Sequence, residues 1–191
     1  MFLLCIVPAF MFVLTSCDFA SNASNEHPLV EIEIEGHGVI TAELFPAYAP
    51  ITVENFLNLV EEGFYDGLTF HRIMSGFMMQ GGCPYGRGFG GSGTYIVGEF
   101  PDNGIENPLS HTRGTLSMAR SWDYDSASSQ FFIMHETNRD LDSGYAAFGR
   151  VISGLDVVDS VISSVTPLDD NGTIDESQQP VIREIRIVNG S

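Results

Sequence analysis

The chain is short of positive charge. Its 191 residues include no lysine and only 8 arginines, against 25 aspartates and glutamates, so its formal net charge is -17 at pH 7. The negative electrostatic field of such a chain repels phosphate backbones and anionic lipid surfaces. We therefore expect no nucleic-acid partner, and we interpret most of the acidic residues as a solvated surface.

Cysteine is also scarce. Two of the three cysteines, Cys5 and Cys17, lie in an N-terminal hydrophobic run, which leaves Cys83 alone in the rest of the chain. One cysteine cannot form an internal disulfide, and no Cys/His cluster has the spacing of a zinc site. We expect neither a metal nor another cofactor. Cys83 is interpreted as a passive small residue, with a reactive thiol as the alternative.

Several catalytic motifs are absent or incomplete. Without a G-x-S-x-G sequence, serine hydrolysis is not supported. Residues 86–91 fit G-x-G-x-x-G by letter, but no strand–helix unit surrounds them. His135 and Glu136 begin an H-E-x-x-H pattern that ends on Arg139 instead of a second histidine. The acidic segment 168–176 lacks the ligand spacing of a calcium loop and is interpreted as a solvated surface turn.

The first seventeen residues form an uncharged hydrophobic run, shorter and more abruptly ended than a typical membrane span. We interpret residues 1–17 as an export signal. Its end, Leu14-Thr15-Ser16-Cys17, resembles the lipobox of bacterial lipoproteins, in which the cysteine is lipidated and begins the mature chain. This predicts an exported protein that is anchored to the membrane through Cys17. Because no basic residue precedes the run and Pro8 interrupts it, a cleaved ordinary signal and an uncleaved anchor remain alternatives.

The rest of the chain is expected to form a short tether and one domain. Residues 18–28 are small and polar, without periodicity, as in a flexible linker. Residues 29–191 contain no internal repeat and no sign of a second domain, and their length suits a single hydrophobic core.

Hydrophobic periodicity predicts a mainly β domain. Residues 29–35 and 39–45 alternate apolar and polar side chains like a hairpin, and residues 181–188 resemble a last strand that pairs back to it. Helical spacing is found in residues 50–62 and 155–162. Between them lie short apolar runs separated by turn residues: 70–73, 77–80, 94–97, 115–119, 131–134 and 148–152. This order favours a closed antiparallel barrel capped by two helices.

The residues left as site candidates lie on separate short strands. They combine one guanidinium and two amides with apolar side chains: Arg72, Phe77, Met78, Gln80, Gln130, Phe132 and Leu141. The set contains no obvious acid–base pair and no pair of typical metal ligands. It suits a neutral ligand that is both apolar and rich in amides, and it is poorly suited to hydrolysis.

Five segments together resemble a cyclophilin-type peptidyl-prolyl isomerase of the bacterial kind. They are FHRIMSGFMMQGG, GFGGSGTYIVGEF, GTLSMARS, SASSQFFIMH and YAAFGRVISGLDVVDSV. The resemblance runs in order from about Leu29 to Val188. It implies an eight-stranded antiparallel barrel capped by two helices. It also implies an enzyme, a peptidyl-prolyl cis-trans isomerase that accelerates X-Pro isomerisation in proline-containing polypeptides. Together with the lipobox-like start, this predicts a role in the folding of exported proteins.

The resemblance also implies roles for individual residues. The catalytic arginine of the family matches Arg72, with Phe77 and Gln80 beside it. The positions implied to bind substrate are Met78, Gly88, Ala119, Arg120, Gln130, Phe132, Leu141 and Tyr145. We expect a monomer, and the alternative function is a proline-peptide binding or chaperone module whose isomerase activity is incidental.

Three positions depart from the pattern of the best-known eukaryotic members. Asp140 replaces a tryptophan, Tyr145 replaces a histidine and Arg120 replaces a common asparagine. The tryptophan is associated in the family with tight cyclosporin binding. Asp140 therefore implies weak inhibition by cyclosporin, without implying a loss of isomerase activity.

Overall fold

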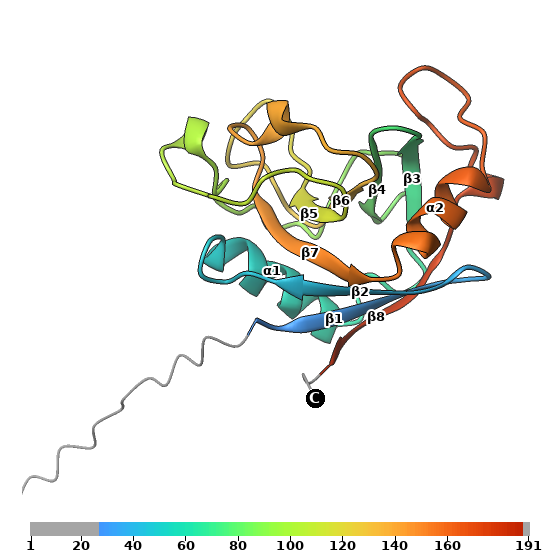
Figure 1. The fold of residues 1–191 in the computed structure, drawn as a ribbon, viewed down its shortest axis with the longest axis horizontal. Helices are drawn as coiled ribbons and strands as arrows, with labels where there is room; N and C mark the ends of the chain where they lie inside the picture. Colours follow the sequence, from blue (N-terminus) through green and yellow to red (C-terminus); the bar gives the residue numbers. More distant parts are fainter. Residues whose placement is uncertain (1–26, 189–191) are drawn as a thin grey trace, which may run out of the picture.

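The computed structural model of the protein describes residues 27–188 (Figure 1). The predicted signal segment, Cys17 and most of the predicted tether lie outside the described residues. Within the part that is described, no helix has the length and apolar character needed to cross a membrane.

The domain is mainly β, as predicted. Its strands are β1 (Leu29–Ile34), β2 (Gly38–Leu44), β3 (Thr69–Met74), β4 (Met78–Cys83), β5 (Thr115–Met118), β6 (Phe131–Met134), β7 (Ala147–Ser153) and β8 (Ile182–Val188). Two α-helices, α1 (Pro50–Glu61) and α2 (Leu155–Ser163), confirm the two predicted helical segments. Three short 3₁₀ turns are η1 (Pro101–Asn103), η2 (Arg139–Leu141) and η3 (Glu176–Gln178).

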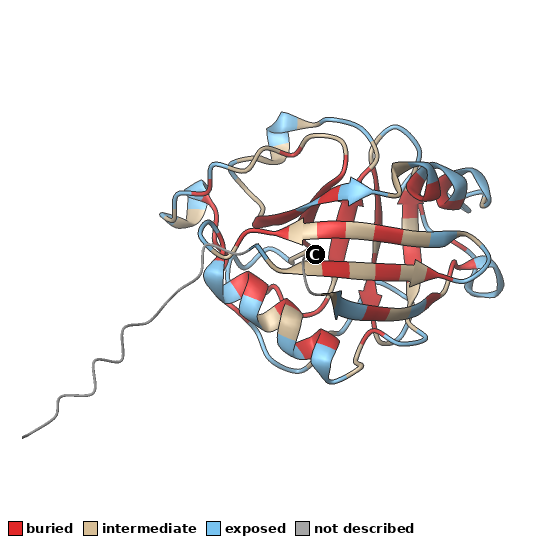
Figure 2. Ribbon diagram, turned by 60° about the horizontal axis from the view of Figure 1, so that its bottom comes forward, coloured by how far each residue is buried: buried red, intermediate tan, exposed pale blue. Residues whose placement is uncertain are grey.

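The N-terminal hairpin pairs with the last strand, which confirms the predicted return of the chain. β1 lies between β2 and β8, antiparallel to both. Val30 and Ile32 are buried, whereas Glu31 and Glu33 alternate with them and form ion pairs with Arg186. This alternation is visible as bands of burial along the strands in Figure 2. A period of two therefore fixes which face of the hairpin joins the core.

The sheet curls into an open half-barrel, so the predicted closed barrel is wrong. The strand order is β3-β4-β6-β5-β7-β2-β1-β8, which leaves β3 and β8 as the two edges. They meet only near their first residues, through an isolated bridge between Thr69 and Val181 and the backbone hydrogen bonds that flank it. Pro180, just before β8, has no N–H to extend the pairing. Farther along β3, the N–H of Ile73 donates to the carbonyl of Gly172 at 2.8 Å. The loop before β8 thus occupies the edge that a closed barrel would need.

An aromatic cluster forms the centre of the core. The ring of Phe56, on α1, lies 5.2 Å from Tyr65, 5.4 Å from Phe131 and 5.1 Å from Phe148, measured between ring centroids. All four side chains are fully buried. Because Phe131 and Phe148 belong to β6 and β7, this cluster attaches α1 directly to β6, which carries part of the site described below, and to its close neighbour in the sheet, β7.

A distant loop caps α1. The residue before the helix, Ala49, offers no side-chain cap. Instead the carboxylate of Glu99, which is only 2% exposed, accepts the N–H of Ile51 at 3.0 Å and that of Thr52 at 2.8 Å. The first N–H groups of a helix have no partner within the helix, and a negative charge there is favourable. Glu99 therefore links the loop between β4 and β5 to the start of α1.

We expect Glu99→Ala to lower the free energy of unfolding by about 1–3 kcal/mol, because it leaves two N–H groups at the start of the helix without an acceptor. Glu99→Gln keeps one acceptor oxygen and should lose less. Urea unfolding, followed by circular dichroism, measures both. Glu106→Ala is the control, since Glu106 is exposed on the same loop. Equal stabilities for Glu99→Ala and the control would refute this capping role.

Candidate active site

The sheet order brings the predicted site residues onto neighbouring strands. β3, β4, β6 and β5 are adjacent, and Arg72 on β3 stands opposite Gln80 on β4 in the register. Because side chains alternate along a strand, Met78 and Gln80 share one face of β4. On β6, Phe132 stands opposite Gln80 and lies on the same face. The predicted residues thus meet although they are far apart in the sequence.

Arg72 is held by neutral groups. Its Nε donates to the backbone carbonyl of Asn171 at 2.8 Å, and its Nη1 donates to Gln80 Oε1 at 3.3 Å. The remaining polar contacts are with thioether sulfurs, Met78 Sδ 3.9 Å from Nη1 and Met74 Sδ 3.2 Å from Nη2. Partial burial lowers the pKa of Arg72 from its usual value. An arginine pKa lies so far above neutrality that the group stays charged.

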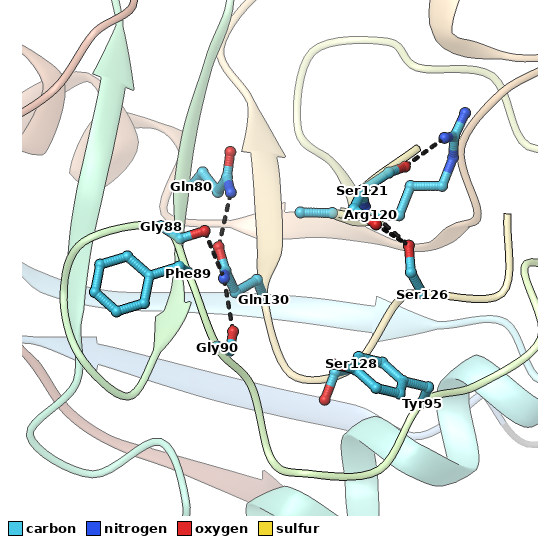
Figure 3. Close-up of a pocket in the computed structure, with 11 residues that line it drawn as sticks. Gln80, Gly88, Phe89, Gly90, Tyr95, Arg120, Ser121, Ser126, Ser128 and Gln130 are labelled. Carbon is cyan, nitrogen blue, oxygen red and sulfur yellow. Dashed lines mark hydrogen bonds between the residues drawn. The ribbon is translucent and has the colours of Figure 1, made fainter. Parts of the chain in front are cut away.

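Two glutamines continue this network. Gln80 Nε2 donates to Gln130 Oε1 at 2.9 Å, and Gln130 Nε2 donates to the carbonyls of Gly88 at 3.1 Å and Gly90 at 2.8 Å (Figure 3). These bonds orient both amides without using any charged group. The guanidinium of Arg72 is thereby connected to the glycine-rich loop that follows β4.

The apolar candidates surround a small cavity next to Arg72. It has a volume of about 200 Å³ and is lined by Arg72, Phe77, Met78, Gln80, Ala119, Arg120, Phe132, Leu141 and Tyr145. Met78 and Phe132 are buried in a hydrophobic cluster of their own, separate from the main core. The cavity is therefore an apolar recess with two guanidinium groups and one amide at its wall.

A second, wider cavity adjoins the first and shares Gln80, Ala119 and Arg120 with it. Its volume is about 460 Å³, and it contains the two remaining candidates, Gly88 and Gln130. Its other lining residues are Phe89, Gly90, Tyr95, Ser121, Ser126 and Ser128, of which Figure 3 shows the arrangement. Asp140, predicted to weaken cyclosporin binding, is exposed and lines neither cavity. That effect stays a prediction.

Arg120 lies among three aromatic rings, which the sequence did not predict. Its guanidinium carbon lies 5.1 Å, 4.9 Å and 4.8 Å from the ring centroids of Phe100, Tyr124 and Tyr145. Its Nε also donates to the carbonyl of Gly144 at 2.8 Å. Cation–π contacts of this kind suit a guanidinium better than an ammonium. Arg120 therefore joins the loop after β5 to the wall that carries Tyr145.

A buried histidine supports the back of the cavity. His111 is fully buried, with Nδ1 2.9 Å from Asp142 Oδ1 and Nε2 2.9 Å from Ser117 Oγ. Its ring stacks on Phe132 at 5.9 Å. Burial lowers the pKa of His111, so the ring is neutral at pH 7. The hydrogen-bonded set Ser117–His111–Asp142 resembles the catalytic triad of a serine hydrolase. It cannot act as one on a bound ligand, because Ser117 is fully buried and lines neither cavity.

The two cavities lack the groups that bond cleavage requires. No Asp, Glu, His or Cys lines either of them. Among the described residues, no cluster of three His, Cys, Asp or Glu side chains could hold a metal ion. Cys83 is buried, and its Sγ lies 3.0 Å from the carbonyl of Phe89. What the site offers is an oriented cation, oriented amides and an apolar recess, which can bind and polarise a neutral amide.

The sequence resembles a well-defined family. Residues 29–189 match the family model described as cyclophilin type peptidyl-prolyl cis-trans isomerase/CLD. The chain is 49% identical over 123 residues to peptidyl-prolyl cis-trans isomerase B of Bacillus subtilis, which covers 64% of this chain and 82% of that protein. It is 45% identical over 126 residues to the peptidyl-prolyl cis-trans isomerase of Helicobacter pylori, covering 65% and 74% respectively.

Solved structures agree with the sequence comparison. A cyclophilin type peptidyl-prolyl cis-trans isomerase of Cryptosporidium parvum, crystallised in the presence of the dipeptide Ala-Pro, superposes with a TM-score of 0.74 at 30% identity and covers 85% of this chain and 99% of that one. A cyclophilin from Hirschia baltica gives a TM-score of 0.68 at 28% identity, covering 84% and 73%. The chain therefore belongs to the cyclophilin family of peptidyl-prolyl cis-trans isomerases.

Proposed function

We propose that isomerisation takes place at the cavity beside Arg72, with Arg72 as the catalytic donor. Rotation about an X-Pro bond breaks amide resonance, and the barrier in water is about 18–20 kcal/mol. In the twisted transition state the proline nitrogen becomes pyramidal and gains a lone pair. A donor directed at this nitrogen stabilises the transition state more than either planar isomer. No covalent bond forms or breaks, so the site needs no acid, base or metal.

The apolar recess contributes in a second way. Phe77, Met78, Phe132 and Leu141 would hold the proline ring and keep water away from the amide. The planar amide is the more charge-separated form, so a less polar environment favours the twisted form relative to it. The observation that carries the proposal is that a cation held by neutral acceptors, Arg72, stands at the wall of this recess.

The remaining candidates would bind the polypeptide on either side of the proline. Gln80 and Gln130 present oriented amides, and Gly88 lies in the neighbouring cavity with them. Ala119 and Arg120 line both cavities, and Tyr145 lines the smaller one. A polypeptide with its proline in the recess could therefore extend into the second cavity. The presence of Ala-Pro in the Cryptosporidium crystal supports a proline-containing peptide as ligand.

The size of the second cavity favours one further candidate function. At about 460 Å³ it is larger than the recess itself and could bind polypeptides regardless of isomerisation. In that case the protein would act as a binding or chaperone module with incidental isomerase activity. Replacing Arg72 distinguishes the two functions. If the biological effect is lost while peptide affinity is retained, the protein acts as an enzyme; if the effect persists, it acts as a binding module.

We also propose that the protein is an exported lipoprotein and acts as a monomer on proteins that fold outside the cytoplasmic membrane. The support is the hydrophobic segment 1–17 with its lipobox-like end and the polar segment 18–28 before the domain. Uncatalysed proline isomerisation takes about tens of seconds and is a slow step in the folding of many chains, so an isomerase outside the cytoplasmic membrane would accelerate the folding of exported proteins.

Arg72→Ala should slow the catalysed cis-to-trans isomerisation of a short X-Pro peptide by at least about tenfold, or about 1.4 kcal/mol of transition-state stabilisation. Arg72→Lys keeps the charge but loses the planar fork, so its rate should lie between the two. Nuclear magnetic resonance exchange measurements give both the rate and the peptide affinity, which we expect to change little.

The matched control is Arg87→Ala, because Arg87 is an exposed arginine paired with Glu176 on the same domain. Unchanged catalysis in Arg72→Ala would contradict the proposed role. If Arg72→Ala lost isomerisation yet fully supported folding of substrates in cells, the binding function would replace the enzymatic one.

Lipidation can be measured on the protein extracted from membranes. We expect an intact mass that corresponds to a chain beginning at a diacylated or triacylated Cys17. Cys17→Ser should release the protein from the membrane fraction, whereas Cys5→Ser should not, because Cys5 would be removed with the signal. A mature chain that begins at any other residue would refute the anchor.

A further inference from the structure

The acidic segment before β8 is largely exposed, as a solvated surface turn should be, but it also pairs with the sheet. Residues 169–174 lie along the free edge of β3. The N–H of Ile174 donates to the carbonyl of His71 at 3.0 Å, and Thr173 forms an isolated bridge with Arg72. Gly172 is buried here, and an added Cβ would lie 2.5 Å from Met74 Cγ. The segment is therefore packed against the strand that carries the proposed catalytic donor.

One carbonyl of this segment fixes the plane of the Arg72 guanidinium. Asn171 lies at the tip of the turn, and its backbone oxygen accepts the Nε–H of Arg72 at 2.8 Å. A guanidinium is planar, so a bond at Nε determines the directions in which the two Nη groups point. With Nε held, Nη1 is directed toward Gln80. The orientation of the donor thus depends on the position of a backbone atom 99 residues away in the sequence.

Asp169 in turn fixes the position of that carbonyl. Its Oδ1 accepts the N–H of Asn171 and the N–H of Thr173, both at 3.0 Å. Its own carbonyl accepts the N–H of Gly172 at 3.1 Å. An aspartate that bonds to the backbone two residues on is a recognised way to form a tight turn. These backbone donors hold the pKa of Asp169 below its usual range, so the carboxylate is charged at neutral pH.

We propose that Asp169 is a positioning residue for isomerisation: it closes the turn of residues 169–173, whose Asn171 carbonyl orients the guanidinium of Arg72. This rests on the proposed role of Arg72. Asp169 lines neither cavity, so it acts on the reaction only through the arginine. The adjacent Asp170 is also exposed and accepts no hydrogen bond among the described residues, so its charge alone should not matter.

The test compares four variants of the full chain in the same peptide assay. Asp169→Ala removes the acceptor and should lower kcat about tenfold with KM nearly unchanged, because donor geometry matters more in the transition state than in binding. Asp169→Asn keeps an acceptor oxygen and should retain most of the wild-type kcat. Asp169→Ser closes the same turn more weakly and should be intermediate. Asp170→Ala is the matched control and should equal the wild type.

A second measurement detects the position of Arg72 without catalysis. In protein labelled with ¹⁵N-arginine, the Arg72 Nε–H resonance should exchange slowly with water in the wild type and in Asp169→Asn. It should exchange quickly in Asp169→Ala. Urea unfolding of each variant shows that the domain is folded, and Asp169→Ser serves the same purpose if Asp169→Ala does not fold.

The outcomes separate this proposal from the proposed function. If Arg72→Ala is inactive but Asp169→Ala and Asp169→Ser keep the wild-type kcat, the positioning role is overturned while the role of Arg72 stands. If Arg72→Ala is fully active, the proposed function itself fails. Adding Asp169→Ala to Arg72→Ala should cause no further loss, because the two residues act in one chain of contacts. An additive loss would mean that Asp169 acts by another route and would also overturn the proposal.

Discussion

The site depends on keeping one guanidinium charged, partly buried and without a direct ion pair to a carboxylate. A carboxylate against Arg72 would occupy its donors and pull them away from the ligand. The protein instead supplies neutral acceptors, namely the Asn171 carbonyl and the Gln80 amide, together with two thioether sulfurs. Neutral acceptors fix direction without neutralising charge. The second amide, Gln130, accepts a hydrogen bond from Gln80 and donates to the loop that follows β4. The orientation of the Arg72 guanidinium therefore depends on three separate segments of the chain.

Strand alternation makes this arrangement compatible with a stable core. On β4, Met79 belongs to the main hydrophobic core while its neighbour Met78 lines the recess. On β6, Phe131 packs in the aromatic cluster with Phe56, whereas Phe132 faces the recess and the ring of His111. Each strand therefore gives alternate residues to stability and to the site. A one-residue change of register would exchange the two sets, which ties the site geometry to correct pairing of the sheet.

Local patterns in the sequence predict much of this fold, and contacts between distant segments explain what they miss. The hairpin and both helices follow from periodicity, and the family resemblance names residues that the sheet does bring around one recess. The predicted strand at 94–97 is reduced to one bridge from Ile96 to Ala127. The closed barrel fails because the segment before β8 takes the edge of β3. Neither the capping role of Glu99 nor the Asn171 carbonyl has a local signal, since each depends on a partner far away in the chain.

The large acidic surplus is compatible with an available cation at the site, because the carboxylates that pair with arginine do so with other arginines. Arg87, Arg113, Arg150, Arg183 and Arg186 all form ion pairs with carboxylates. Arg72 and Arg120, the two arginines that line the recess, form none within residues 27–188. Arg72 is bound by amide and carbonyl oxygens, and Arg120 lies among three aromatic rings. Separating paired surface arginines from these two lets a chain of net charge -17 keep an available cation beside an apolar recess.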